Sequence, residues 1–145
     1  MIHAKDMEFV QEISLSIPPE VVWSALTEPE RVKMYHLAPL QKIELKAGGD
    51  ILYGVGKEVM ISGVITEVQE HSRLSHTFRF GSQCQPATTT DGETLVIYEL
   101  REESGSTILK LTHTGFTEEN QTYANIAGGW PYILERLKVW LEKKE

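Results

Sequence analysis

The sequence predicts an α+β domain in which an antiparallel sheet is covered by one long C-terminal helix. From residue 40 to 116, short alternating segments are separated by turn residues, which is the pattern of antiparallel strands. From residue 128 to 142, apolar residues recur every three or four positions, which is the period of a helix. A lone helix cannot bury such a stripe, so the sheet face is its expected partner. The stripe consists of Trp130, Ile133, Leu134, Leu137, Trp140 and Leu141.

The first predicted strand covers residues 9–17, with Phe9, Ile13 and Leu15 as its apolar positions. Pro18 and Pro19 then end the strand and begin a short helix, because proline suits the first turn of a helix. This helix has an apolar face and runs as far as residue 26.

A second short helix is expected directly after the first. Thr27 is its expected N-cap, Pro29 lies in its first turn, and Glu30 completes a capping box. The helix ends before Pro39. Two short helices therefore follow the first strand.

Six further strands are expected between residues 40 and 116. Gly48-Gly49 marks a hairpin turn, and Gly63 indicates a bulge within the strand at 59–68. The pair Gly128-Gly129 is expected to allow close packing of the last helix. The remaining expected segments are strands at 74–80, 93–101 and 107–113, a turn at 103–105, a loop at 81–92 and a helix cap at Thr117.

Composition favours a single domain over residues 1–145, because 41% apolar residues in a chain of this length suffice for one core. The net charge of −7 argues against binding to a nucleic-acid backbone. No apolar run is long enough to span a bilayer, so membrane insertion is not expected. The first six residues do not open a signal peptide, and Cys84 is the single cysteine. A reducing cytoplasm is therefore the expected location.

Several local motifs carry a resemblance to a known family. Their order along the chain resembles the START-like (SRPBCC) superfamily, and within it the activator of heat-shock-chaperone ATPase homologue-like family. The motifs are residues 17–30, Glu44-x-Lys46-x-Gly48-Gly49, residues 63–68 followed by Arg73-Leu74, residues 112–116, and Gly128-Gly129-Trp130.

The resemblance implies a helix-grip fold, in which a curved antiparallel sheet wraps around a long C-terminal helix and leaves a hollow between them. It leaves function open, because the superfamily includes lipid carriers, hormone receptors and cyclases. Where the family commonly has paired tryptophans near the pocket mouth, this chain has Tyr35-His36. That departure implies a different ligand preference.

Nine residues are candidates for lining the pocket between sheet and helix. They are Trp23, Tyr35, Tyr53, His76, Phe78, Tyr98, His113, Trp130 and Leu134. In this fold such side chains either line a pocket or fill the core.

Two of the nine candidates are histidines, and the two-residue period of a strand directs His76 and His113 towards the interior. Inward histidines suit a metal site, acid–base chemistry or a hydrogen-bonded pocket wall. The wall is favoured because no carboxylate or cysteine lies at metal-ligand spacing. Of the two, His113 is the better candidate for touching a ligand. Cys84 has no positive neighbour, which favours an incidental thiol. No metal, cofactor or catalytic residue is therefore expected.

The sequence thus predicts a protein that binds a small apolar or aromatic molecule between the sheet and the C-terminal helix. Two alternatives stay open. One is a cochaperone-like protein-binding module, and the other is an enzyme of the cyclase or hydrolase kind that uses a pocket histidine. A protein partner and the oligomeric state are also left open.

Overall fold

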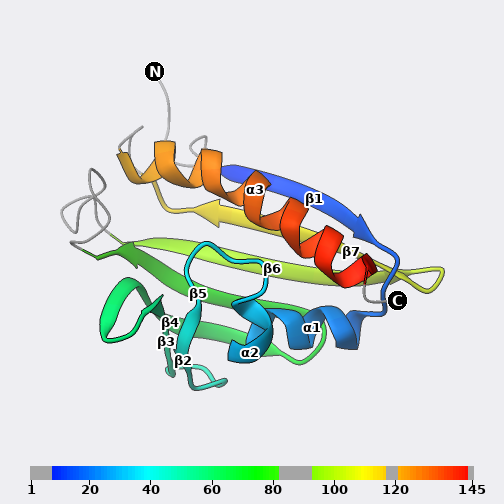
Figure 1. Cartoon of the computed structure of the whole chain (residues 1–145), viewed down its shortest axis with the longest axis horizontal. Helices are drawn as coiled ribbons and strands as arrows, with labels where there is room; N and C mark the ends of the chain where they lie inside the picture. Colours follow the sequence, from blue (N-terminus) through cyan, green and yellow to red (C-terminus); the bar gives the residue numbers. More distant parts are fainter. Residues whose placement is uncertain (1–7, 82–92, 117–120, 144–145) are drawn as a thin grey trace.

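The computed structural model describes residues 8–81, 93–116 and 121–143 (Figure 1). Within them the elements follow one another in the order strand, two helices, six strands, helix, as the sequence predicts. The elements are β1 (Phe9–Leu15), α1 (Pro19–Thr27), α2 (Pro29–Val32), β2 (Leu40–Ile43), β3 (Asp50–Val55), β4 (Glu58–Gln69), β5 (Arg73–Phe80), β6 (Thr94–Glu103), β7 (Ser106–Thr114) and α3 (Gln121–Lys143). The expected cap at Thr117, Cys84 and most of the expected loop lie outside the described residues.

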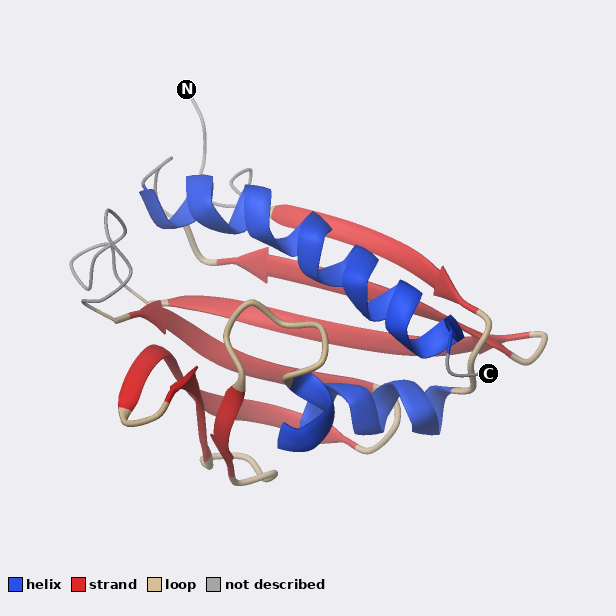
Figure 2. Ribbon diagram, viewed as in Figure 1, coloured by secondary structure: helices blue, strands red, loops and turns tan. Residues whose placement is uncertain are grey.

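The strands form one curved antiparallel sheet in the order β1-β7-β6-β5-β4-β3-β2. Its first and last strands in the chain therefore meet, with Phe9 opposite His113. The helices lie over one face, with α3 across β1 and β7 and the α1–α2 pair beside it (Figure 2). This arrangement confirms the α+β class and the helix-grip fold.

The apolar stripe of α3 is buried against the sheet. Leu137 is 0% exposed and Leu134 is 1% exposed, whereas Trp140 is only partly buried. The charged residues of the same helix, such as Glu135 and Arg136, lie on its exposed side. The period of three and four residues therefore identifies the packed face correctly.

The predicted cap of the second short helix is wrong. Thr27 is the last residue of α1, and its Oγ1 donates to the carbonyl oxygen of Trp23 at 2.9 Å. Glu28 occupies the N-cap position of α2 and makes no side-chain capping bond. Glu30 pairs instead with Lys33 at 2.7 Å. Because Thr27 still belongs to α1 and only Glu28 separates the two helices, the Thr27 hydroxyl is satisfied within its own helix.

Two of the three glycine predictions need correction. The hairpin turn is confirmed, with Gly48 at a φ of +87°. At Gly63 there is no register shift, and a Cβ would lie 2.0 Å from the carbonyl oxygen of Thr77. This glycine therefore permits close approach of β4 and β5. Close packing at Gly128 and Gly129 is also wrong, because a Cβ on Gly128 would meet nothing within 4 Å and one on Gly129 nothing nearer than 3.8 Å.

Candidate functional site

An apolar cavity of about 230 Å³ lies between α3 and the β4–β5 part of the sheet. The loop after α2, the start of β4, the end of β5 and one side of α3 form its walls. None of the described lining residues is acidic, lysine or arginine. The lining consists of His36, Leu37, Ala38, Met60, Ile61, Phe78, Phe80, Asn125, Ile126, Gly129, Trp130 and Ile133.

The size of the cavity limits what it can hold. An engineered cavity of about 150 Å³ lined by apolar side chains binds benzene, whereas pockets for drug-sized ligands begin at about 300 Å³. At about 230 Å³, this cavity matches a molecule of one or two small rings.

Arg136 on α3 forms hydrogen bonds to the loop after α2, which borders the cavity. Its Nε donates to the carbonyl oxygen of Tyr35 at 3.0 Å, and a second nitrogen reaches the carbonyl of Met34 at 3.5 Å. Its third nitrogen donates to the Tyr132 hydroxyl at 3.3 Å. The next residues along the loop, His36 to Ala38, form the cavity wall. Arg136 therefore positions that wall relative to the helix.

A directed hydrogen-bond chain runs from α3 into the sheet. Trp130 Nε1 donates to His113 Nδ1 at 3.0 Å, because an indole nitrogen is only a donor. The neutral ring of His113 therefore carries its proton on Nε2, which donates to Thr94 Oγ1 at 2.7 Å. The Thr94 hydroxyl then donates to the carbonyl oxygen of Phe78 at 3.2 Å. Both ring nitrogens of His113 are thus occupied inside the protein.

His76 has one nitrogen left over. Its Nδ1 lies 2.7 Å from the carbonyl oxygen of Thr77, and a carbonyl only accepts, so Nδ1 carries the proton. Nε2 is then a bare acceptor, buried and without a hydrogen-bond partner among the described residues. The ring lies about 6 Å from those of Tyr53 and Tyr98 (centroid separations 6.2 and 6.1 Å).

Burial keeps this interior layer uncharged. It lowers the pKa of His36 and of His113 to about 3, with nearby His76 as the second cause, and lowers that of His76 to about 4. Burial also raises the pKa values of the Tyr53 and Tyr98 hydroxyls above their usual range. The histidines are therefore neutral near pH 7, and the site offers dipoles rather than charges.

The nine candidate residues fall into three groups. Phe78 and Trp130 line the cavity. Tyr53, His76, Tyr98 and His113 form the buried layer next to it, linked by ring contacts. Trp23, Tyr35 and Leu134 are buried elsewhere in the core, and the Tyr35 hydroxyl donates to the Ala25 carbonyl at 2.7 Å. Ligand contact by any of the nine stays a prediction.

The sequence reasoning did not place His36 among the candidates, although it lines the cavity. The available signal was the Tyr35-His36 pair standing where the resembled family has tryptophans. Gly129 was not among the candidates either, although it lines the cavity. Its missing side chain leaves the cavity open and does not serve close packing of the helix.

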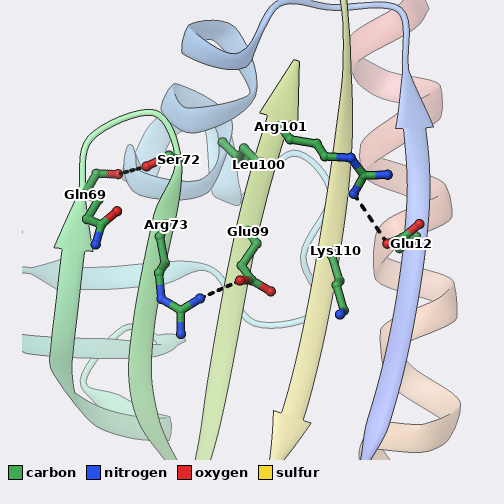
Figure 3. A pocket seen from close by; sticks show the side chains of 8 residues that line it. All are labelled: Glu12, Gln69, Ser72, Arg73, Glu99, Leu100, Arg101 and Lys110. Carbon is green, nitrogen blue, oxygen red and sulfur yellow. Dashed lines mark hydrogen bonds and ion pairs between the residues drawn. The ribbon is translucent and has the colours of Figure 1, made fainter. Parts of the chain in front are cut away.

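A larger hollow of about 490 Å³ lies on the opposite face of the sheet from α3 (Figure 3). Charged side chains of alternating sign follow one another across the neighbouring strands that line this hollow. Glu12 on β1 lies opposite Lys110 on β7, and Lys110 lies opposite Glu99 on β6. Arg73 pairs with Glu99, and Arg101 pairs with Glu12 at 3.6 Å. It is an open groove of partly paired, half-exposed charges, so the apolar cavity is the better candidate site.

The described residues offer neither a cluster suited to a metal ion nor a helix suited to a bilayer. No group of three or more histidine, cysteine, aspartate or glutamate side chains in them is placed to hold a metal ion. None of the helices in the described part of the chain is both long and apolar enough to cross a membrane.

The model of the family described as Activator of Hsp90 ATPase homolog 1-like protein matches residues 16–142. The chain belongs to this family. The match covers α1, α2, all of α3 except its last residue, and the strands β2 to β7, including every residue that lines the cavity. No match was found among curated proteins.

Solved structures share the fold of this family member. CalU16 from Micromonospora echinospora is 25% identical, with a TM-score of 0.73 over 90% of this chain and 73% of that one. Protein MLL2253 from Mesorhizobium loti is 24% identical, with a TM-score of 0.80 over 95% and 98%. PFC0360w, an HSP90 activator from Plasmodium falciparum, is 22% identical, with a TM-score of 0.74 over 94% and 96%. At these identities the last two show the fold alone.

Proposed function

We propose that this protein binds a small, uncharged, largely apolar molecule in the cavity between α3 and the sheet. The observation that carries the proposal is a cavity of about 230 Å³ whose described lining holds no charged side chain. Burying an aromatic ring in such a space removes apolar surface from water at a gain of about 25 cal/mol per Å². The cytoplasmic location stays a prediction.

The two adjacent glycines of α3 provide a matched test. Gly129 lines the cavity, whereas Gly128 is exposed and a Cβ there would meet nothing within 4 Å. Gly129→Leu places a side chain in the cavity, and Gly128→Leu removes a helix glycine without doing so. The probe is α-methylstyrene, and the Trp130 indole N–H resonance is followed by NMR titration.

We expect saturable binding to the parent and to Gly128→Leu within about twofold, and a loss of about tenfold or more in Gly129→Leu, equivalent to 1.4 kcal/mol. Equal affinity in the two variants would place the ligand elsewhere. Mass spectrometry of small molecules that co-purify with the native protein then identifies the natural ligand.

A protein-binding role is the second candidate. Met34 on the loop after α2, and Tyr132 and Val139 on the outer side of α3, are each about half exposed, and Arg136 bonds to the Met34 carbonyl and the Tyr132 hydroxyl. Exposed apolar groups of this kind mark interaction surfaces when they are contiguous. The structural similarity to an HSP90 activator supports an HSP90 chaperone as the partner to try. Loss of HSP90 binding in Val139→Glu, with cavity binding retained, would favour this role.

Catalysis by the interior histidines ranks third. His113 has both ring nitrogens occupied, so it has no free atom for proton transfer. His76 has a bare Nε2, yet its lowered pKa of about 4 makes it a weak base near pH 7. A screen of ester, thioester and cyclisation substrates on the parent, His76→Ala and His113→Ala checks this ranking. Turnover that disappears in His76→Ala while the fold persists would reverse it.

A further inference from the structure

Two polar side chains lie among the described residues that line the cavity, His36 and Asn125. Asn125 already takes part in other interactions. His36 is held by its own loop, because the backbone N–H of Ala38 donates to its Nδ1 at 3.0 Å. Since Nδ1 accepts, the neutral ring carries its proton on Nε2. His36 thus lines the cavity with one donor, Nε2–H, that its own loop does not use.

The ring of His36 is held on two sides. It stacks on Tyr53 with ring centroids 4.9 Å apart and planes 23° from parallel, and it meets Trp130 edge-on at 6.0 Å. No hydrogen bond from Nε2 to any described residue accompanies these contacts. His36 is of intermediate burial and lines the cavity, so its side chain borders the space that a ligand would occupy. This donor is thus oriented in advance and uncommitted.

The surroundings of His36 exclude a charged donor. Burial, and secondly the neighbouring His76, lower the pKa of His36 below its usual value, which favours the neutral ring near pH 7. The other described lining residues supply no cation. A carboxylate that entered the cavity would lose its hydration without gaining an opposite charge, which is strongly unfavourable.

We propose that His36 Nε2–H is the specificity-determining donor of the cavity and selects an uncharged aromatic molecule that carries an oxygen acceptor, such as an aryl ketone. This inference rests on the proposed function and narrows its ligand class. A hydrocarbon of the same shape fits the apolar walls but leaves Nε2–H unpaired. A carboxylate of the same shape supplies an acceptor but also a buried charge.

The test compares three probes of nearly one shape. Acetophenone carries a carbonyl oxygen, α-methylstyrene replaces that oxygen with a CH2 group, and benzoate carries a charge. Dissociation constants are measured by NMR titration for the parent, His36→Phe and His36→Gln. The ratio of the acetophenone to the α-methylstyrene constant is the readout, because changes in cavity shape affect the two probes alike. Thermal unfolding of each variant verifies the fold.

We expect the ratio to shift by about 3- to 10-fold against acetophenone in His36→Phe, the range of one net hydrogen bond. His36→Gln, whose amide keeps a donor, should recover much of the parent ratio. Benzoate should bind the parent more weakly than acetophenone. An unchanged ratio in folded His36→Phe, or tighter binding of benzoate, would overturn the role of His36 while leaving the cavity as a binding site. Failure of acetophenone and α-methylstyrene to bind the parent would instead overturn the proposed function, and this inference with it.

Discussion

Trp130 donates its indole N–H to Nδ1 of His113 across 3.0 Å, and this bond joins the long helix to the C-terminal end of β7. Because the indole is only a donor, it also fixes the proton of His113 on Nε2 and hence the direction of the bond to Thr94. One contact thus sets the hydrogen-bond polarity of the adjoining wall of the cavity.

Trp130→Phe tests this contact. The replacement keeps an aromatic ring but leaves His113 Nδ1 as a buried acceptor without a partner, which costs about 1–3 kcal/mol beyond any cavity left behind. Urea unfolding measures the loss. A double-mutant cycle with His113→Phe isolates the pair, and a coupling energy of zero would show that the bond contributes nothing to stability.

Leu137→Ala tests the grip of α3 on the sheet. Leu137 is 0% exposed, so truncation should lower the free energy of unfolding by about 2–5 kcal/mol. Val139→Ala, two residues along on the exposed side, is the control and should change it by about 0.5 kcal/mol or less. Similar values for the two variants would mean that the helix does not pack as described.

The buried histidines should make stability fall in mild acid. Their pKa values are lowered in the folded protein, so below about 6.5 the unfolded chain binds protons that the folded state does not. Their contribution is present above pH 6.5 and is lost as the pH falls towards their folded pKa values. Each such histidine contributes a slope of up to about 1.4 kcal/mol per pH unit.

His76→Leu isolates one of these protons. Urea unfolding of the parent and of His76→Leu between pH 7.5 and pH 5 should give a shallower pH dependence in the variant. Its stability at pH 7.5 should change less than that of Trp130→Phe, because the buried Nε2 without a partner is removed with the ring. Identical slopes for parent and variant would mean that His76 takes up protons while folded.

Arg136→Met should loosen the cavity wall without unfolding the protein. The methionine keeps an apolar stem but removes the bonds to the Met34 and Tyr35 carbonyls. Because Arg136 is exposed, the free energy of unfolding should fall by about 1 kcal/mol or less. Amide hydrogen exchange at residues 35–38 should accelerate, and the off-rate of a cavity probe should rise. Unchanged exchange there would mean that other contacts hold the loop.

Local patterns sufficed for much of the fold. The apolar period of α3 identifies Leu134 and Leu137 as buried, and the two-residue period of β5 and β7 directs His76 and His113 inward, as the structure confirms. These predictions succeed because each depends on neighbours within a few residues. The predicted cap at Thr27 is wrong because the Thr27 hydroxyl has two possible uses at similar distances along the chain. It could cap the following helix, but it bonds to the carbonyl oxygen of Trp23 in its own helix.

The geometry of the cavity could not be predicted from such local patterns. The proton position on His36 depends on a bond to Ala38, and its ring position depends on Tyr53 and Trp130, which are distant in sequence. The openness at Gly129 depends on how far α3 stands from the loop that carries Leu37. Spacing along the chain carries no information about such distances.

The pairing of β1 with β7 has a consequence for synthesis on the ribosome. The Thr107 hydroxyl on β7 donates to the carbonyl oxygen of Ile17, which lies 90 residues earlier, and Phe9 lies opposite His113. The first strand to emerge must therefore wait for the last one before the sheet can close, and such high contact order slows folding. During that interval the apolar side of β1 stays uncovered, and the growing sheet ends in an unpaired strand edge, the kind of surface on which nascent chains aggregate.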